Sequence, residues 1–440
     1  MYFTNNAKRS FLIVSCLLAM SSPAHAYGPE GLFGGRAEPD GSIAVARPTN
    51  LKNDRPDRAE SVLEHARPDY DPVPVEFGSF EMYPSLELGE NYESNLFATD
   101  GDEREDVHGI IRPVVNLFSN WGRHALSITT FGDFAYYSQN PDENYQSMVV
   151  DAAGRYDILN RMWVEGRMGH QYLAESRTSP NDVNGRVPVT FNLSKAGMTF
   201  YRGVGSLHLT LDYDFKRFRY DDTPAAGGAI DQSLRSRDEH KTTMTWDYAM
   251  TGNVSPYLRA SYETRPYTDY KEHDATGYEA LAGTTVDMGG ITSLDVYAGW
   301  MVRDYDDFAT TKHLSSPRVG GRIDWNPTGL TSVVLEANRT LEETSITNYN
   351  SYYATGGSVT VTHELYRNIL LEGNLGFSRY DFNGSTERQD DVLGVGCGTR
   401  YLISRNLYTD AMYNWEGRES SEVDNDYARH LVMMRVGIHY

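Results

Sequence analysis

The stretch that decides the fold is Ser206-Leu207-His208-Leu209-Thr210-Leu211-Asp212-Tyr213-Asp214-Phe215-Lys216. Its odd-numbered residues are apolar or aromatic, and its even-numbered residues are polar or charged. A helix with 3.6 residues per turn would mix the two sets on every face, whereas a strand with a period of two separates them. The stretch therefore predicts a β-strand that has one apolar and one polar face.

The same period continues from Tyr83 to the end of the chain, for example over residues 294–303 and 369–380. The connections alternate between short turns and longer, acidic links. Short turns are expected at 120–122, 159–160, 202–205, 252–253, 289–290, 326–329, 366–368 and 404–406. Longer links are expected at 98–106, 139–144, 175–188, 221–237, 270–275, 306–313, 344–350, 382–389 and 418–425. Such a pattern predicts about 18 strands, with 16 as the alternative count.

The predicted strands have about 12–15 residues, whereas strands of globular sheets usually have about 5–6 and a tilted strand needs ~9–11 to cross a bilayer. This length disfavours a sandwich or a propeller. A closed barrel satisfies every backbone hydrogen bond without water, so it can span lipid. Residues 81–440 are therefore predicted to form an all-β, transmembrane, up-and-down antiparallel β-barrel, preceded by a mostly irregular N-terminal segment.

The composition agrees with a barrel and excludes other classes of protein. The mean hydropathy of -0.54 is low for a membrane protein, but only every second residue of a barrel strand needs to be apolar. Two cysteines among 440 residues cannot form a disulfide scaffold or a thiolate metal cluster. A net charge of -21 argues against a nucleic-acid partner.

The first 26 residues have the pattern of a secretory signal peptide. Lys8 and Arg9 precede an apolar run over residues 11–20, and Ala24-His25-Ala26 has the small-residue form of a cleavage site. The alternatives are a buried helix and lipidation at Cys16. Cleavage after Ala26 removes two basic residues, which leaves 38 of the 40 basic residues against 61 acidic ones.

Residues 27–80 form a Pro-rich polar segment that contains seven of the 18 prolines. Regular apolar periodicity is absent there, so the segment cannot bury a core of its own. It is expected to be a periplasmic segment or a plug of the barrel.

The last predicted strand ends with Val436, Ile438 and Tyr440 on one face. An aromatic terminus preceded by apolar residues at every second position is similar to the signal that outer-membrane barrels present to the barrel assembly machinery. The expected partners are therefore this machinery and outer-membrane lipid. The expected location is the outer membrane of a Gram-negative bacterium, with both termini in the periplasm because both lie on the short-turn side.

Aromatic residues gather toward the two ends of the predicted strands, which predicts two interfacial girdles. The group toward the long links comprises Tyr136, Tyr137, Tyr213, Tyr220, Tyr267, Trp300, Tyr305 and Tyr380. The group toward the short turns comprises Trp121, Tyr156, Trp163, Trp325, Tyr366 and Tyr401.

Several motifs at the start of the barrel resemble a known family. They are residues 67–72 (RPDYDP), 78–80 (GSF), 83–86 (YPSL) and 93–99 (ESNLFAT), together with 119–126 (SNWGRHAL) and 154–157 (GRYD). This pattern is similar to the second putative β-barrel porin family of Gram-negative bacteria, whose relatives include barrels of exopolysaccharide operons. Residues 73–76 (VPVE) depart from the family's usual continuation. The resemblance implies a fold and a location but no solute.

The sequence offers no catalytic, cofactor or metal motif. Gly394, Gly396 and Gly398 alternate along one strand, which predicts a strip without side chains facing the lumen, and Cys397 is expected to face lipid. His363 and Glu364 are adjacent and so face opposite sides, which disfavours joint metal binding. The clusters at 303–306 (RDYD) and 379–381 (RYD) are expected to be rim ion pairs. A hydrolase site assembled across strands is the remote alternative.

The polar faces of the strands predict the lining of an aqueous lumen, since barrels of 16–18 strands leave a channel. The expected lining residues are Asp133, Glu165, Arg167, Asp212, Asp214, Asp295, Glu336, Glu372, Arg400 and Arg435. This set favours a passive, cation-leaning channel for hydrated solutes. The alternative is the outer-membrane component of exopolysaccharide export, in which Tyr297 and Tyr380 would stack on sugars and periplasmic export components would be partners.

Overall fold

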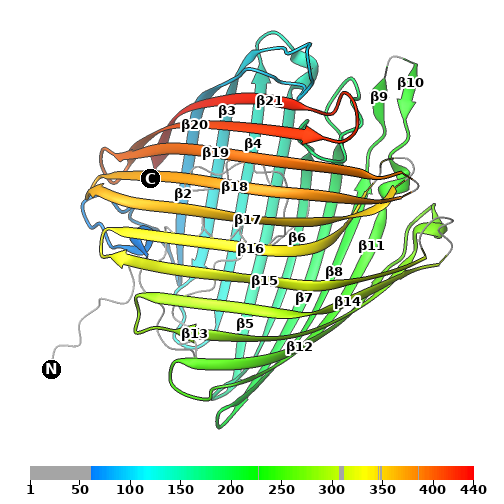
Figure 1. The fold of residues 1–440 in the computed structure, drawn as a ribbon. Coiled ribbons are helices and arrows are strands. Elements are labelled where there is room, and N and C mark those ends of the chain that lie inside the picture. The colour runs from blue at the N-terminus through cyan, green and yellow to red at the C-terminus, as the bar shows by residue number, and fades with distance from the viewer. Residues whose placement is uncertain (1–60, 226, 307–311, 345, 347–348, 385) are drawn as a thin grey trace.

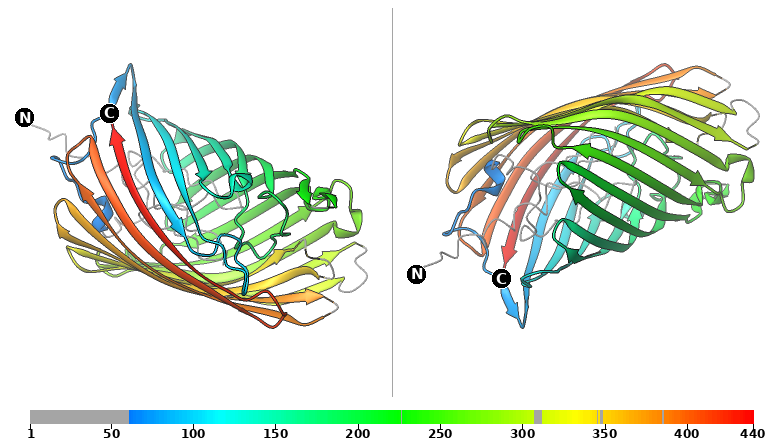
Figure 2. Two further views of the ribbon diagram at one scale, coloured as in Figure 1. Left: turned by 90° about the horizontal axis from the view of Figure 1, so that it is seen from above. Right: turned by 90° about the horizontal axis from the view of Figure 1, so that it is seen from below.

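The computed structural model describes residues 61–225, 227–306, 312–344, 346, 349–384 and 386–440. These residues form a closed antiparallel barrel of 18 strands. Figure 1 shows β15–β21 running across the front of the barrel with β3–β8 behind them, and Figure 2 shows the same barrel from above and below. The predicted signal peptide and residues 27–60 lie outside the described residues.

Barrel strands follow one another around the wall in chain order. They are β2 (Phe80–Glu93), β3 (Asp106–Ser119), β4 (Ala125–Tyr137), β5 (Tyr145–Leu159), β6 (Met162–Ala174), β7 (Thr190–Val204), β8 (Leu207–Tyr220), β11 (Arg237–Tyr248), β12 (Val254–Arg265), β13 (Ala275–Asp287), β14 (Thr292–Tyr305), β15 (His313–Thr328), β16 (Thr331–Glu343), β17 (Tyr349–Tyr366), β18 (Ile369–Gly384), β19 (Arg388–Leu402), β20 (Leu407–Ser420) and β21 (Tyr427–His439). The barrel closes where β2 pairs with β21, from Ser85↔His439 to Glu93↔Leu431.

Short elements occupy the links. The strand β1 (Val75–Phe77) pairs with the start of β2, and β9 (Thr223–Ala225) and β10 (Gly228–Ile230) form a separate hairpin in the link between β8 and β11. Single 3-10 turns are η2 (Val62–Glu64), η3 (Pro141–Glu143), η4 (Ser233–Arg235) and η5 (Lys271–His273). Among the described residues, no helix is long and apolar enough to cross a membrane.

The burial pattern confirms the predicted alternation. In β18, residues 370, 372, 374, 376, 378, 380 and 382 are buried, while Leu375 and Phe377 are exposed on the outer face. Large apolar side chains are likewise exposed on other strands, for example Met168 and Leu258, as contact with lipid requires. One predicted turn shows why glycine is needed there: Gly289 and Gly290 have φ angles of 69° and 80°, which L side chains rarely adopt.

The inner end of the N-terminal segment lies inside the barrel. Val62 and Leu63 of η2 are buried against Leu370, Met412 and Met433, which are inward-facing residues of β18, β20 and β21. Figure 2 shows this part of the chain near the end of the barrel that carries the short turns. Residues 61–71 therefore occupy part of the lumen at that end.

The prediction of the aromatic girdles was wrong for six residues. Tyr136, Tyr213 and Trp300 are exposed on the outer face as expected, as are Trp121, Tyr156, Trp325, Tyr366 and Tyr401. In contrast, Tyr137, Trp163, Tyr267, Tyr305 and Tyr380 are buried, and Tyr220 lines an internal cavity. Their positions along the strand were correct, but the period of two places their side chains on the inner face.

Candidate functional site

The link at 175–189 folds across the mouth of the barrel on the long-link side. The carbonyl of Thr178 accepts a hydrogen bond from Arg418 of β20 (3.3 Å). Thr344, which follows β16, donates a hydrogen bond from its Oγ1 atom to the side-chain oxygen of Asn181 (2.8 Å). These contacts join the link to the opposite wall. The link therefore narrows the lumen rather than extending away from it.

Buried ion pairs hold the same link against its own side of the mouth. Glu175 accepts two hydrogen bonds of 2.8 Å from Arg235, and Arg177 binds Glu143 at 2.6 Å. All four side chains are nearly inaccessible to solvent. Asp182 lies 3.4 Å from Arg177, and burial raises the pKa of Asp182 to about 6. Paired charges with further hydrogen bonds are the form in which buried charges are tolerated.

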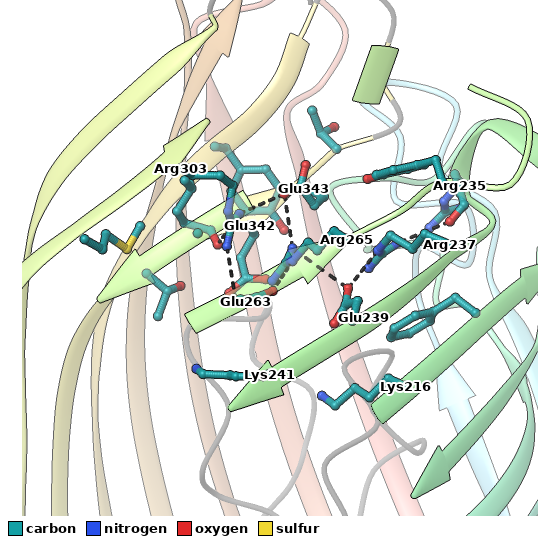
Figure 3. A pocket seen from close by; sticks show the side chains of 18 of the residues that line it. Lys216, Arg235, Arg237, Glu239, Lys241, Glu263, Arg265, Arg303, Glu342 and Glu343 are labelled. Atoms are coloured by element: carbon teal, nitrogen blue, oxygen red, sulfur yellow. Dashed lines mark hydrogen bonds and ion pairs between the residues drawn. The ribbon is translucent and has the colours of Figure 1, made fainter. Parts of the chain in front are cut away.

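A cavity of about 370 Å³ lies between this link and the strands β8–β17. Figure 3 shows a network of arginines and glutamates along its wall. Arg303 binds Glu343 at 2.8 Å, Arg265 binds Glu343 at 3.1 Å, and Arg265 also contacts Glu263 and Glu239. The cavity is thus lined by charges of both signs that largely neutralise one another.

A glycine permits this network to form across three strands. Gly277 of β13 is paired with Glu263 on one side and with Arg303 on the other. An added Cβ at Gly277 would lie in ordinary contact with both side chains, at 3.7 Å from the Cβ of Glu263 and 3.9 Å from Nε of Arg303. A methyl group would therefore fit at this position, whereas a longer side chain would obstruct Arg303, which extends over β13 toward Glu263.

Three of the predicted lining residues surround a fourth, Arg167. Arg167 of β6 lies 2.9 Å from Asp214, 3.9 Å from Asp212 and 3.5 Å from Glu165. Its Nη1 atom also donates to Thr199. The sequence placed these residues on the polar faces, and the register of β6, β7 and β8 brings them together.

Two further groups of predicted lining residues form rows across neighbouring strands. In the first row, Arg322 lies opposite both Asp295 and Glu336 and binds Glu336. Tyr257 also donates to Asp295 at 2.9 Å. In the second row, the carboxylate of Asp410 lies between Arg400 and Arg435. Opposite charges on directly paired residues each stabilise a sheet by roughly 0.2–1 kcal/mol.

Asp410 of β20 is the centre of that second row. It lies opposite Arg400, which it binds at 2.8 Å, and opposite Arg435. Asp133 binds Arg112 of the neighbouring strand at 2.8 Å. Glu372 is buried opposite Gly398, so all ten predicted residues lie on the inner face.

The two clusters predicted as rim ion pairs are divided between the faces. Asp304 binds His313 at 2.6 Å and Arg379 binds Asp391 at 2.7 Å, and these pairs are exposed on the outside. Arg303, however, belongs to the internal network. Adjacent residues of a strand cannot share a face, so each cluster had to separate.

Other sequence predictions concern positions that make no contact with the cavity. Gly394 and Gly396 face the interior, and an added Cβ at Gly396 would collide with Asn374 and Asn414. Cys397 is exposed on the outer face, and so are Val436, Ile438 and Tyr440. Glu364 is buried on the face opposite to His363. The described residues contain no group of three His, Cys, Asp or Glu that could hold a metal ion.

Sequence reasoning missed the network around Glu343 and the partners Arg112 and Asp410. The charges themselves lay on predicted inner faces, but their cross-strand partners depend on register. It also missed the inward course of the link 175–189. The charged residues Glu175, Arg177 and Asp182 were visible in the sequence of this link, and in the structure all three form buried ion pairs.

The comparisons with known proteins agree with this architecture. Residues 67–440 match the family described as Putative beta-barrel porin 2. A comparison with curated protein sequences gives no significant match. Similar solved structures include the outer membrane protein OpdK from Pseudomonas aeruginosa, with 13% identity, a TM-score of 0.45, and coverage of 82% of this chain and 99% of that one.

A BenF-like porin from Pseudomonas fluorescens Pf-5 is similar at 10% identity and a TM-score of 0.46, with coverage of 82% of this chain and 99% of that one. No solute preference follows from likenesses of this size. The match to the family covers nearly the whole described chain and every strand of the barrel. This chain therefore belongs to the Putative beta-barrel porin 2 family and is a porin-like β-barrel of the outer membrane.

Proposed function

We propose that the chain is a passive channel for hydrated solutes and catalyses no reaction. The observation that carries this proposal is the inner wall, where charged residues of both signs form cross-strand rows from β3 to β21. Such a wall suits solutes that keep part of their hydration shell, because side-chain charges at close range substitute for water. The link at 175–189 sets the narrowest section.

The proposed channel prefers cations. The chain carries 61 acidic against 40 basic residues. The described basic residues of the wall are largely bound to carboxylates, as Arg167 is to Asp214 and Arg322 is to Glu336. The surplus of negative charge therefore raises the local concentration of cations in the lumen.

The proposed orientation places the long links outside the cell and both termini in the periplasm. In this arrangement residues 1–26 direct export, and the face of Val436, Ile438 and Tyr440 is presented to the barrel assembly machinery. The described part of the N-terminal segment, residues 61–80, then enters the lumen from the periplasm, where Arg67 and Glu364 form an ion pair. The family description names a porin and no export role, so we do not propose a role in polysaccharide export.

Proteoliposome swelling tests this function. Vesicles that contain the refolded chain should swell in isotonic solutions of small sugars and more slowly as the sugar becomes larger. Reversal potentials in a KCl gradient should show preference for K⁺ over Cl⁻. Vesicles that do not swell, although the protein in them is folded by heat-modifiable mobility, would contradict an open pathway.

A further inference from the structure

The barrel wall contains a seam between β15 and β16. These strands pair from Gly320↔Asn338 to Trp325↔Val333 and again at Thr328↔Thr331. Residues 313–319 of β15 and 339–343 of β16, all of which the structure describes, have no ladder pairing with each other. Figure 1 shows the two strands separating toward the end that carries β9 and β10.

The seam edge of β15 follows from its bonds to β14. Lys312 accepts from the backbone N–H of Tyr305, and Asn326 donates to Ile291. Even-numbered residues of β15 therefore bond to β14, and odd-numbered residues direct their backbone groups toward β16, because bonding alternates along an antiparallel strand. Pro317 is one of these odd residues and has no N–H, which is the usual place for proline in a sheet.

The seam edge of β16 is defined in the same way. Glu364 donates to Leu330 and Thr344 donates to Asn350, so even-numbered residues of β16 bond to β17. The carbonyls of Arg339 and Leu341 therefore point toward β15. These carbonyls accept hydrogen bonds from side chains of the wall instead: Arg318 donates to Arg339, and Arg303 donates to Leu341 at 3.5 Å.

Side chains thus hold the seam where the ladder stops. The apolar part is a cluster that includes Leu314 of β15, Leu341 of β16 and Tyr305 of β14, with Met301 packed against it. Met301 and Leu341 also line the cavity described above. The cavity therefore has an apolar side at the seam, in contrast to its charged remainder.

Two polar groups at the seam are not engaged. The hydroxyl of Thr340 has no hydrogen-bond partner among the described residues, although Thr340 is only 4% exposed and lines the cavity. Continuing the register of β15 and β16 would have paired Thr340 with Arg318. The carboxylate of Glu342, two residues further along the same inner face, forms no ion pair with any described residue. An unpaired buried hydroxyl costs free energy until a ligand binds it, and the half-buried carboxylate of Glu342 is available to bind a cation at the same place.

We infer that this corner of the cavity binds an amphiphilic organic cation, with an ammonium head at Glu342 and Thr340 and an apolar body against Met301 and Leu341. The arginines nearest to it are already compensated, Arg318 by Glu279 at 3.1 Å and Arg303 by Glu343 at 2.8 Å. The uncompensated charge at the seam is therefore negative. This inference rests on the proposed function and names a solute class for the same cavity.

An anionic ligand is the competing expectation, because Lys241 also lines the cavity and forms no ion pair with a described residue. Lys241 lies on β11, however, and four strands separate β11 from β16. An anion held at Lys241 would not use the apolar seam. A probe of opposite charge therefore distinguishes a cation site at Glu342 from an anion site at Lys241.

The test is a calorimetric titration of the full mature chain, refolded in detergent, with 2-phenylethylammonium chloride. We expect saturable binding, and binding at least about tenfold weaker for ethylammonium, which lacks the apolar body, and for 3-phenylpropionate, which inverts the charge. Glu342→Gln and Thr340→Val should each weaken binding of the first probe about tenfold. Thr340→Ser, which retains the hydroxyl, should restore it.

Asp381→Asn is the matched control, because Asp381 lies 3.9 Å from Arg339 on the outer face and its loss should leave binding unchanged. Stronger binding of 3-phenylpropionate, or unchanged binding by a heat-modifiable, folded Glu342→Gln variant, would overturn the inference. Since calorimetry does not depend on conductance, a chain that conducts but does not bind the amine refutes only the inference. A chain that binds it but never conducts refutes the proposed channel.

Discussion

Arg67 and Glu364, almost 300 residues apart in the chain, form an ion pair of 2.5 Å inside the lumen, and both side chains are at most 1% exposed. Glu364 also accepts from His65 and Arg367, each at 3.1 Å. Arg405 also holds this segment, because it donates a hydrogen bond to the carbonyl of Pro68 at 2.7 Å. One carboxylate of β17 thus fixes residues 65–68 against the short-turn end of the barrel.

Replacing Glu364 with Gln should release the segment 61–71. Removing one partner of a buried ion pair commonly costs about 3–5 kcal/mol, because the other charge stays buried without compensation. We expect chymotrypsin to cut at Leu63 and Tyr70 in the folded variant and not in the unaltered protein. Asp102→Asn is the control, because its pair with Arg104 is exposed and should not affect cleavage. Full protection of the Glu364→Gln variant would refute this anchoring.

Shortening the link 177–186 to two glycines should widen the channel. Within this stretch Arg177, Thr178 and Asn181 bind three separate parts of the mouth. Without it, single-channel conductance should roughly double, as expected when a constriction sets the resistance. Deleting residues 100–103, which are exposed, should leave conductance unchanged. Equal conductance of both variants and the unaltered chain would place the constriction elsewhere.

Cysteine pairs should detect the seam. Continuing the register of Asp324↔Val334 would pair Ser316 with Glu342. In a chain with Cys397 replaced by serine, D324C/V334C should oxidise rapidly, because a disulfide needs Cα atoms within about 7 Å. S316C/E342C should stay reduced under the same conditions. Equal rates for the two pairs would show that the ladder continues across the seam.

Acidity should tighten the link over the mouth. Burial raises the pKa of Asp182 to about 6, above the usual value near 4 for an exposed aspartate. The packed link therefore holds the proton of Asp182 more strongly than the detached link, so the contribution of Asp182 to the link's stability is greatest below pH 4 and is lost as the pH rises through 6. The change is on the order of 2 kcal/mol.

Hydrogen–deuterium exchange of amides 176–186, corrected for the intrinsic effect of pH, should show more protection at pH 4.5 than at pH 7. Asp182→Asn should abolish most of this difference, because the amide does not ionise. A difference of the same size in the variant would assign the pH dependence to another group.

Much of the fold could be predicted from the sequence because successive residues of a barrel strand face lipid and lumen in turn, so that the polarity of each residue indicates its face. The alternation in 206–216 and 369–380 gave the faces correctly, and turn residues such as Gly289 and Gly290 located the connections. Strand identity and face are local properties. All ten predicted lining residues lie on the inner face for this reason.

Contacts that join distant residues could not be predicted in this way. Asp410 lies between Arg400 and Arg435 only because β19, β20 and β21 adopt one particular register. The burial of Tyr305 and Tyr380 was missed because position along a strand was given more weight than parity. The seam and the inward link depend on missing or unusual pairings, and a regular pattern in sequence does not reveal them.

Single-channel recording in planar bilayers tests the central claim most directly. The chain refolded to its heat-modifiable form should produce discrete conductance steps in KCl. The steps should carry more current from K⁺ than from Cl⁻ and should grow when the link 177–186 is shortened. A folded chain that inserts and gives no steps, with the link shortened as well, would contradict the account of this barrel as a passive channel.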